Sequence, residues 1–250
     1  RKSMTKRVAL VTGGTGAIGR EICLALAEAG CSVAANCHPG DLEAAQAWVE
    51  GLKNGHSDVH LFPFDVSDYA ASVAGVTSVE EALGTIDILV NAAGITRDAR
   101  LLNLEPEQWS AVLRTNLDSV YNVTRPVLAG MVTRGFGRVV NISSVNGQQG
   151  QFGQANYSAA KAGVHGFTMA VAREVARKGV TVNTISPGYI ESPLIMQVPE
   201  NIRDNIREQI PVGRFGKPAE IARAVKFLCE EHSGFITGAD LSVNGGYYMS

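Results

Sequence analysis

The chain has 250 residues, of which 45% are hydrophobic and 18% are charged, and its formal net charge is −2. This length suits one large α/β domain with a well-buried core. Acidic and basic residues are interspersed and no apolar run is long enough to span a bilayer, so neither nucleic acid nor a membrane is an expected partner.

Short apolar runs alternate with amphipathic segments along the whole chain. Strands are predicted at residues 7–12, 32–36, 59–63, 86–90, 138–142, 180–185 and 241–243. Helices are predicted at residues 21–29, 41–53, 69–83, 106–128, 157–177 and 218–229. This alternation is typical of right-handed βαβ units. It predicts an α/β fold over residues 4–250: a single-domain, doubly wound parallel sheet of the Rossmann type with helices on both faces.

The cysteines and histidines give no sign of a metal site. The four cysteines, at positions 23, 31, 37 and 229, lack Cys-x-x-Cys spacing, and we expect reduced thiols in a cytoplasmic protein. His56 and His60 are four residues apart, but their segment is rich in Gly, Asn and Asp, so exposed loop histidines are expected there. Residues 1–3, which precede Met4, are expected to be a cloning remnant.

A glycine-rich turn joins the first predicted strand to the first helix. It contains Gly13, Gly16 and Gly19. In such a strand–turn–helix unit the glycines let the backbone approach a pyrophosphate, and the helix N-terminus supplies N–H groups and the positive end of its dipole. Glycines also serve ordinary turns, but this context predicts dinucleotide binding.

Small and polar residues follow several other predicted strands. Asp65 follows the third strand, where a carboxylate could accept a hydrogen bond from an adenine amino group. Asn91-Ala-Ala-Gly94 ends the fourth strand, Ser143 and Ser144 follow the fifth, and Pro187-Gly188 follows the sixth. Each alone could be an ordinary turn. Because carboxyl ends of parallel strands share one edge, together they predict a ligand site there.

Tyr157 and Lys161 are four residues apart on a predicted helix, and Ser144 lies thirteen residues before Tyr157. This spacing puts the phenol and the ammonium on one helix face. A Lys beside a Tyr stabilises the phenolate and is expected to lower the pKa of the phenol, which suits proton transfer near neutral pH. Ser144 could hydrogen-bond a substrate oxygen. The set predicts proton transfer to or from a carbonyl or alcohol.

These features, in order and with the expected spacing over essentially the whole chain, resemble the short-chain dehydrogenase/reductase family. The resemblance implies a catalytic tetrad of Asn116, Ser144, Tyr157 and Lys161. In it Tyr157 is the general acid in reduction and Ser144 binds the carbonyl oxygen. Lys161 holds the nicotinamide ribose, and Asn116, at a local break in its helix, holds a water that relays protons to Lys161.

Two positions depart from the family pattern, neither in the tetrad: Ala17 replaces a glycine of the turn, and Ala92 stands where an Asn is usual. The cofactor-binding residues expected on the resemblance and the strand-end pattern are Gly13, Thr15, Gly16, Ile18, Gly19, Asn36, His38, Asp65, Val66, Asn91, Ala92, Gly94, Tyr157, Lys161, Pro187, Gly188 and Ile190.

Three segments resemble more specifically the acetoacetyl-CoA reductases of polyhydroxybutyrate synthesis, which make (R)-3-hydroxybutyryl-CoA. They are residues 95–98, 141–154 and 183–190. The amides and the ring of the second segment suit a short β-keto thioester. The substrate residues expected are Asp98, Ser144, Gln151, Phe152, Gln154, Tyr157 and Tyr189. Residues 191–210 are expected to form a mobile lid.

Two alternatives stay open. A basic patch beside the mouth of the site would favour a 3-oxoacyl-(acyl-carrier-protein) reductase. Arg97, Arg100, Arg134 and Arg138 could supply such a patch, although CoA phosphates would bind to the same charges. A dinucleotide-binding regulator without turnover is disfavoured by the complete tetrad. The resemblance further implies a homotetramer, built from residues 106–128, 157–177 and the apolar segment 234–250.

Coenzyme choice depends on the charge at the end of the second strand, where enzymes that bind the 2′-phosphate of NADPH ordinarily have an Arg or a Lys. Residues 31–52 contain neither, and His38 is their only potential cation. An Asp that would hold both ribose hydroxyls of NADH is absent too, although Asn36 could bond one of them. We expect NADH to be used at least as well as NADPH, unless a cation outside this window, such as Arg20, reads the phosphate.

Overall fold

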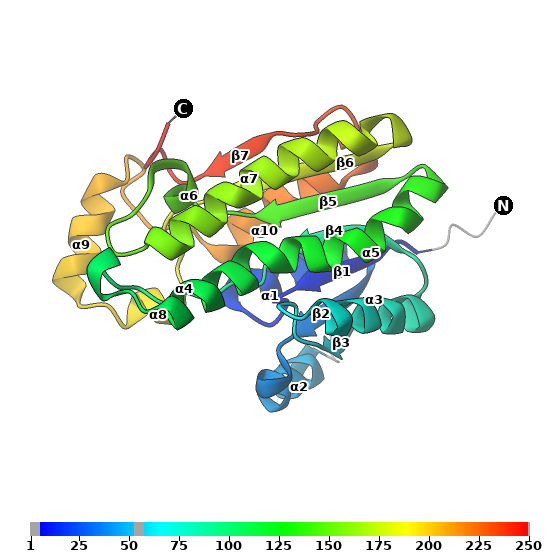
Figure 1. Cartoon of the computed structure of the whole chain (residues 1–250), viewed down its shortest axis with the longest axis horizontal. Coiled ribbons are helices and arrows are strands. Elements are labelled where there is room, and N and C mark those ends of the chain that lie inside the picture. The colour runs from blue at the N-terminus through cyan, green and yellow to red at the C-terminus, as the bar shows by residue number, and fades with distance from the viewer. Residues whose placement is uncertain (1–5, 53–57, 250) are drawn as a thin grey trace.

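The computed structural model of the chain describes residues 6–52 and 58–249. Residues 1–3, His56 and the predicted helix end at residue 53 therefore lie outside the described residues. The described parts form one layer of parallel strands between two layers of helices (Figure 1). Within these described parts, no helix is long and apolar enough to cross a bilayer.

In the described residues the sheet has seven strands in the order β3-β2-β1-β4-β5-β6-β7, and neighbouring strands pair in parallel. Their bounds are β1 Val8–Thr12, β2 Ser32–Cys37, β3 Val59–Pro63, β4 Ile86–Asn91, β5 Gly137–Ile142, β6 Val180–Pro187 and β7 Asp240–Val243. The strand order reverses between β1 and β4, which is the switch point where such sheets bind ligands. The predicted doubly wound fold is confirmed.

Helices cover both faces because both faces of the strands are apolar. In β1, Ala9 and Val11 pack with α1 (Ala17–Glu28) and α10 (Pro218–Cys229) on one side. Val8 and Leu10 pack with α3 (Tyr69–Leu83), α5 (Ser119–Arg134) and α7 (Ala155–Val175) on the other. Alternate residues of a strand point to opposite faces, so the continuous apolar run is the sign of a central strand.

The segment predicted as one helix at residues 106–128 is helical throughout, but the regular α-helix is interrupted inside it. It begins as α4 (Pro106–Leu113), passes through one π-helical stretch, η3 (Arg114–Asp118), and continues as α5 to Arg134. It ends there because Gly135 takes up the left-handed conformation, with φ 73°. The predicted end near residue 128 was therefore six residues early, while the break implied by the family resemblance is present.

Several short elements were not predicted. The helix α6 (Val145–Gln149) begins directly after β5, and α8 (Pro193–Met196) and α9 (Glu200–Gln209) form the segment expected to be a lid. Between β2 and β3, a short turn η1 (Pro39–Asp41) precedes the helix α2 (Leu42–Leu52), which was predicted to begin at residue 41. The remaining short turns are η2 (Leu101–Asn103), η4 (Ala176–Lys178) and η5 (Glu231–Ser233).

Candidate active site

A cavity of about 540 Å³ opens at the carboxyl ends of β4, β5 and β6. Three of the four predicted catalytic residues, Ser144, Tyr157 and Lys161, line it together with the glycine turn. The predicted residues Ile18, Ala92, Gly94, Gln154, Pro187, Gly188, Tyr189 and Ile190 line it as well. The strand-end residues are therefore brought together at one edge of the sheet.

A second cavity of about 630 Å³ lies beside the first and shares Gly13, Gly16, Ala92, Gly94, Ile95 and Arg97 with it. The predicted residues Thr15, Asn36, His38, Asp65 and Val66 line this second cavity. Because the two cavities share the glycine turn and the segment after β4, they form one elongated groove that runs from the ends of β2 and β3 to Tyr157.

The groove fits a dinucleotide. A Cβ at Gly13, where φ is +61°, would lie 2.8 Å from the Cα of Ala93, so only glycine lets the turn approach this close to the end of β4. Helix α1 begins directly after Gly16 with no side-chain cap, and its free N–H groups can take a pyrophosphate. Gly13, Gly16 and Gly19 would hold the phosphates, and Asp65 and Val66 would face the adenine.

Two predicted cofactor residues have their side chains turned into the protein. Asn36 is buried; its oxygen accepts from Gly13 N at 3.2 Å, and its amide donates 2.9 Å to Phe64 O. Asn91 donates 2.8 Å to Asn141 Oδ1 inside the sheet. The expectation that Asn36 bonds a ribose hydroxyl is corrected on this geometry, because its amide groups already tie β2 to the glycine turn and β3.

The adenosine end of the groove carries Arg20, the cation outside residues 31–52 that the sequence analysis named. Arg20 lines this cavity with His38 and Asp65, its Nε donates 2.8 Å to Thr15 O, and its Cζ lies 5.2 Å from the ring centre of Trp48. His38 Nε2 lies 4.0 Å from Asp65 Oδ2. Arg20 comes four residues after Gly16, so helical spacing alone could have placed it at the turn.

Lys161 is buried and points toward the sheet. Its Nζ donates 2.8 Å to Ile142 O and lies 5.7 Å from the centre of the Tyr157 ring. Burial disfavours the ammonium and lowers the pKa of Lys161 from 10.5 to about 8. The amine is therefore close enough to neutral pH to exchange its proton.

The pKa of Tyr157 is raised, which corrects the expectation that Lys161 lowers it. Burial of the phenol is the main cause, the hydrogen bond with Ser144 acts in the opposite direction, and Asp98 raises the pKa further. The free-energy cost of burying the phenolate thus exceeds the stabilisation of the phenolate by Ser144. Tyr157 is held as a phenol at neutral pH, which is the form that donates a proton.

Asn116 lies at the π-helical break and is fully buried. Its amide donates to Val112 O at 2.9 Å and to Ile95 O at 2.8 Å, and its oxygen accepts from Ile95 N at 3.1 Å. A Cβ at Gly94 would lie 2.5 Å from Asn116 Oδ1 and 3.7 Å from Lys161 Nζ. Asn116 and Lys161 therefore both lie close to Gly94, which lines the cavity, while Asn116 itself does not line it.

Ser144 is held by the start of α6. Its Oγ accepts from Asn146 N at 3.1 Å, which caps this helix. The preceding Ser143 Oγ donates 2.9 Å to Lys161 O and lies 2.7 Å from His165 Nε2. These bonds fix the end of β5 against α7, so that Ser144 and Tyr157 meet at the cavity.

The predicted substrate residues divide into two groups. Gln154 and Tyr189 line the catalytic cavity, and Gln154 Nε2 donates 2.8 Å to Asp98 Oδ2. Gln151 and Phe152 do not line it; both are exposed, Phe152 by 77%. The expectation that these two border the reacting carbonyl is wrong, because the turn after α6 directs them outward at the mouth.

The lid segment contributes to the cavity through Ser192 and Ile195, two lining residues that the sequence did not single out. No residue of α9 is buried, whereas Tyr189 at the base of the segment packs edge-on against Tyr247, with 5.3 Å between ring centres. Burial and Tyr247 raise the pKa of Tyr189 to about 12. That the segment moves stays a prediction.

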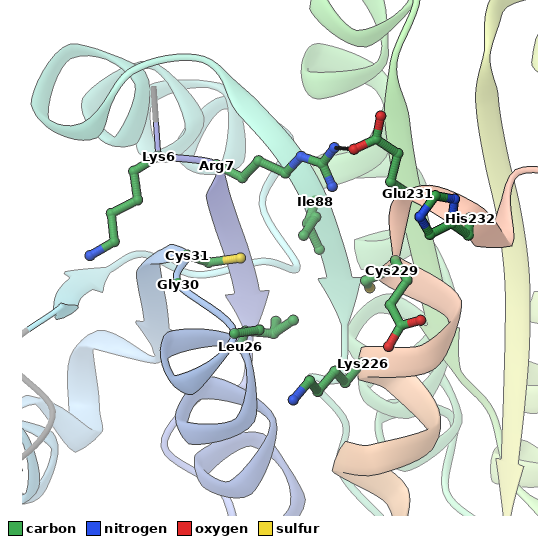
Figure 2. Close-up of a pocket in the computed structure, with 12 residues that line it drawn as sticks. Lys6, Arg7, Leu26, Gly30, Cys31, Ile88, Lys226, Cys229, Glu231 and His232 are labelled. Carbon is green, nitrogen blue, oxygen red and sulfur yellow. Dashed lines mark hydrogen bonds and ion pairs between the residues drawn. The ribbon is translucent and has the colours of Figure 1, made fainter. Parts of the chain in front are cut away.

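Another cavity, of about 650 Å³, lies at the opposite end of the sheet (Figure 2). Its lining includes Cys31 and Cys229, whose pKa values are both raised by burial, and an ion pair of 3.0 Å between Arg7 and Glu231. Buried thiols with raised pKa values are poor nucleophiles. All four cysteines are free and buried, and among the described residues no cluster of three potential metal ligands occurs.

Comparison with known proteins agrees with this geometry. The family model described as enoyl-(acyl carrier protein) reductase matches residues 14–248. The chain is 55% identical to the acetoacetyl-CoA reductase of Allochromatium vinosum and 54% identical to that of Rhizobium meliloti, over 97% and 98% of its length and 99% of each relative. It is 43% identical to the 3-oxoacyl-[acyl-carrier-protein] reductase of Vibrio cholerae, over 97% of its length and 98% of the relative. The chain therefore belongs to the short-chain dehydrogenase/reductase family and is an NAD(P)-dependent oxidoreductase.

Proposed function

We propose that the protein reduces acetoacetyl-CoA to (R)-3-hydroxybutyryl-CoA with a nicotinamide coenzyme. One observation carries the proposal: Ser144, Tyr157 and the buried Lys161 line one cavity, which Gln154 and Tyr189 bound as well. The names of the Allochromatium vinosum and Rhizobium meliloti relatives agree with this substrate.

A nicotinamide dinucleotide held in the groove would supply a hydride to the carbonyl carbon. The chain's own part is to bind the carbonyl oxygen and protonate it. Ser144 and Tyr157 both offer an O–H to that oxygen, and the raised pKa of Tyr157 keeps its proton available at neutral pH. Lys161, with a pKa of about 8, can return a proton to Tyr157.

The substrate wall supports a short β-keto thioester. The Gln154 amide is held between Asp98 and Asn146, with 2.8 Å and 2.9 Å between the bonded atoms, so it is pre-oriented. Two hydroxyls that converge on one oxygen favour reduction of a carbonyl over the carbon–carbon double bond of an enoyl group, which has no oxygen at the reacting carbons.

A 3-oxoacyl-(acyl-carrier-protein) reductase is the alternative, and the 43% identity to such an enzyme favours it. The basic patch expected for a carrier protein is smaller than the sequence suggested. Arg138 is buried at the start of β5 and bonds to the backbone carbonyls of Glu230 and Glu231, and Arg134 lies 3.5 Å from Asp87, at the far edge of the sheet. Arg97 and Arg100 remain near the site.

For the coenzyme, we propose that NADH is used at least as well as NADPH. The end of β2 offers His38 beside Asp65, an environment that disfavours a 2′-phosphate dianion. Arg20 is the cation that would favour it, but its Nε is already bonded to Thr15 O and its guanidinium lies over Trp48. A resident metal is not part of the proposal.

We also propose a cytoplasmic homotetramer. Exposed apolar side chains on the outer helices and in the C-terminal segment support the assembly: Trp109, Tyr121, Met169, Phe235, Leu241 and Met249. Other members of the apolar C-terminal segment, such as Val243 and Ile236, pack against the core instead. Free buried thiols are typical of reducing compartments.

The test is a substrate panel with purified protein: acetoacetyl-CoA, an acetoacetyl-(acyl-carrier-protein) and a small ketone such as acetone, each with NADH and with NADPH. The proposal predicts the highest kcat/KM for acetoacetyl-CoA and an (R)-configured product. A higher kcat/KM for the carrier-protein thioester would favour the alternative, and no turnover of any of them would contradict both.

A further inference from the structure

The mouth of the catalytic cavity carries a guanidinium stacked on an exposed aromatic ring. The Cζ of Arg100 lies 5.2 Å from the ring centre of Phe152, and Arg100 is exposed. Among the residues that the structure describes, no carboxylate forms an ion pair with Arg100. A stacked guanidinium with no acidic partner is a ready binder of phosphate.

The backbone around this pair is built to hold it at the mouth. Ala99 N donates 2.9 Å to Gly153 O, and a short parallel bridge joins Ala99 to Gln154. Phe152 lies between Gly150 and Gly153, both at φ +78°, so the turn leaves the ring outside the cavity. The loop after β4 and the loop after α6 are thus joined at Gly153 and Gln154. Gln154 lies in the cavity, and Phe152 lies outside it.

The pair is continuous with the catalytic cavity rather than part of it. Gln154, two residues after Phe152, lines the cavity, and so does Arg97, three residues before Arg100. A thioester held at Tyr157 must carry its long pantetheine arm out of the cavity. The phosphorylated nucleotide at the end of that arm then reaches the rim, where the exposed residues are Arg100, Leu101, Leu102 and Phe152.

We propose that Arg100 and Phe152 bind the phosphorylated adenine nucleotide of the CoA thioester, with the guanidinium on its phosphates and the ring against the adenine. This inference rests on the proposed function and names the part of the chain that distinguishes CoA from smaller thioesters. Aromatic rings stack with bases and Arg binds phosphate bidentately, so one stacked pair serves both ends of the nucleotide.

The experiment compares two substrates that differ only in the nucleotide: acetoacetyl-CoA and the acetoacetyl thioester of N-acetylcysteamine. For Arg100→Gln, the kcat/KM for acetoacetyl-CoA divided by that for the truncated thioester should fall about tenfold, a change of ~1.4 kcal/mol. The change should lie in KM, and it should shrink in 1 M salt, which screens an exposed charge. Phe152→Ala should lower the same ratio without this salt dependence.

The matched control is Arg177→Gln, which removes the same charge from the exposed η4 turn at the opposite edge of the sheet. It should leave the ratio unchanged. Two results would overturn the inference, provided that the parent reduces acetoacetyl-CoA. The first is an unchanged ratio in Arg100→Gln. The second is an equal loss of kcat/KM for both substrates together with dissociation of the assembly. If the parent reduces neither thioester, the proposed function itself fails.

Discussion

Replacing Lys161 by Met should make the folded protein more stable at neutral pH while abolishing efficient turnover. The structure buries this ammonium completely and lowers its pKa from 10.5 to about 8. At ~1.36 kcal/mol per pKa unit, the parent folds against a penalty of about 3 kcal/mol when both states are protonated. Met keeps the apolar stem of Lys and removes the charge.

One favourable contact is lost with the amine. Lys161 Nζ donates 2.8 Å to Ile142 O, and loss of that hydrogen bond costs roughly 1 kcal/mol. The variant should therefore be about 2 kcal/mol more stable than the parent at pH 7. Because its ammonium costs stability, Lys161 serves the chemistry of the site rather than the stability of the fold.

The sign of the pH dependence follows from the lowered pKa. Below pH 8 the native and unfolded chains both hold the proton, so the penalty is complete. Between pH 8 and 10.5 the native state releases the proton first, and the parent gains stability as the pH rises. The advantage of the variant should therefore shrink to about 0.5 kcal/mol at pH 9.5.

The assay is denaturant unfolding of parent and variant at pH 7 and pH 9.5, at one fixed protomer concentration because assembly contributes to stability. Lys178→Met, on the exposed η4 turn, is the control and should show no pH-dependent gap. The reasoning is refuted if Lys161→Met is no more stable than the parent at pH 7, or if the gap is the same at both pH values.

Three further predictions concern the wall of the site, the coenzyme and the assembly. Gly94→Ala would bring a methyl group 2.5 Å from Asn116 Oδ1. The kcat should therefore fall, and the free energy of unfolding should decrease by about 1–3 kcal/mol. A variant with the kcat and the unfolding free energy of the parent would contradict the packing described. The kcat/KM with NADH should at least equal that with NADPH, and Arg20→Gln should change the NADH value little; an NADPH value more than about tenfold higher, lost in Arg20→Gln, would identify Arg20 as the phosphate reader. Sedimentation at micromolar concentration should give a tetramer, and a monomer there would remove the assembly from the account.

The sheet and the tetrad could be predicted because their signals are local. Strands buried on both faces appear as continuous apolar runs, and Tyr157 and Lys161 are one helical turn apart whatever surrounds them. The π-helical break at Asn116 was expected only through the family resemblance. Nothing in its own sequence, Arg-Thr-Asn-Leu-Asp, marks it.

What failed depended on burial, which a sequence window does not contain. The sign of the Tyr157 pKa was missed because desolvation exceeds the effect of its neighbours. Arg138 was counted as a surface charge, although it begins a central strand and is buried among backbone carbonyls. Gln151 and Phe152 lie between Ser144 and Tyr157 in sequence, yet a turn with two glycines directs them away from the cavity.

The central claim is that Tyr157 protonates the oxygen of a β-ketoacyl-CoA. The most direct measurement compares kcat for acetoacetyl-CoA in the parent and in Tyr157→Phe, with coenzyme affinity measured alongside. Loss of the hydroxyl should lower kcat by roughly 10²–10⁴-fold and leave the coenzyme Kd nearly unchanged, because the ring stays in place. Turnover at the parent rate in Tyr157→Phe would contradict the account.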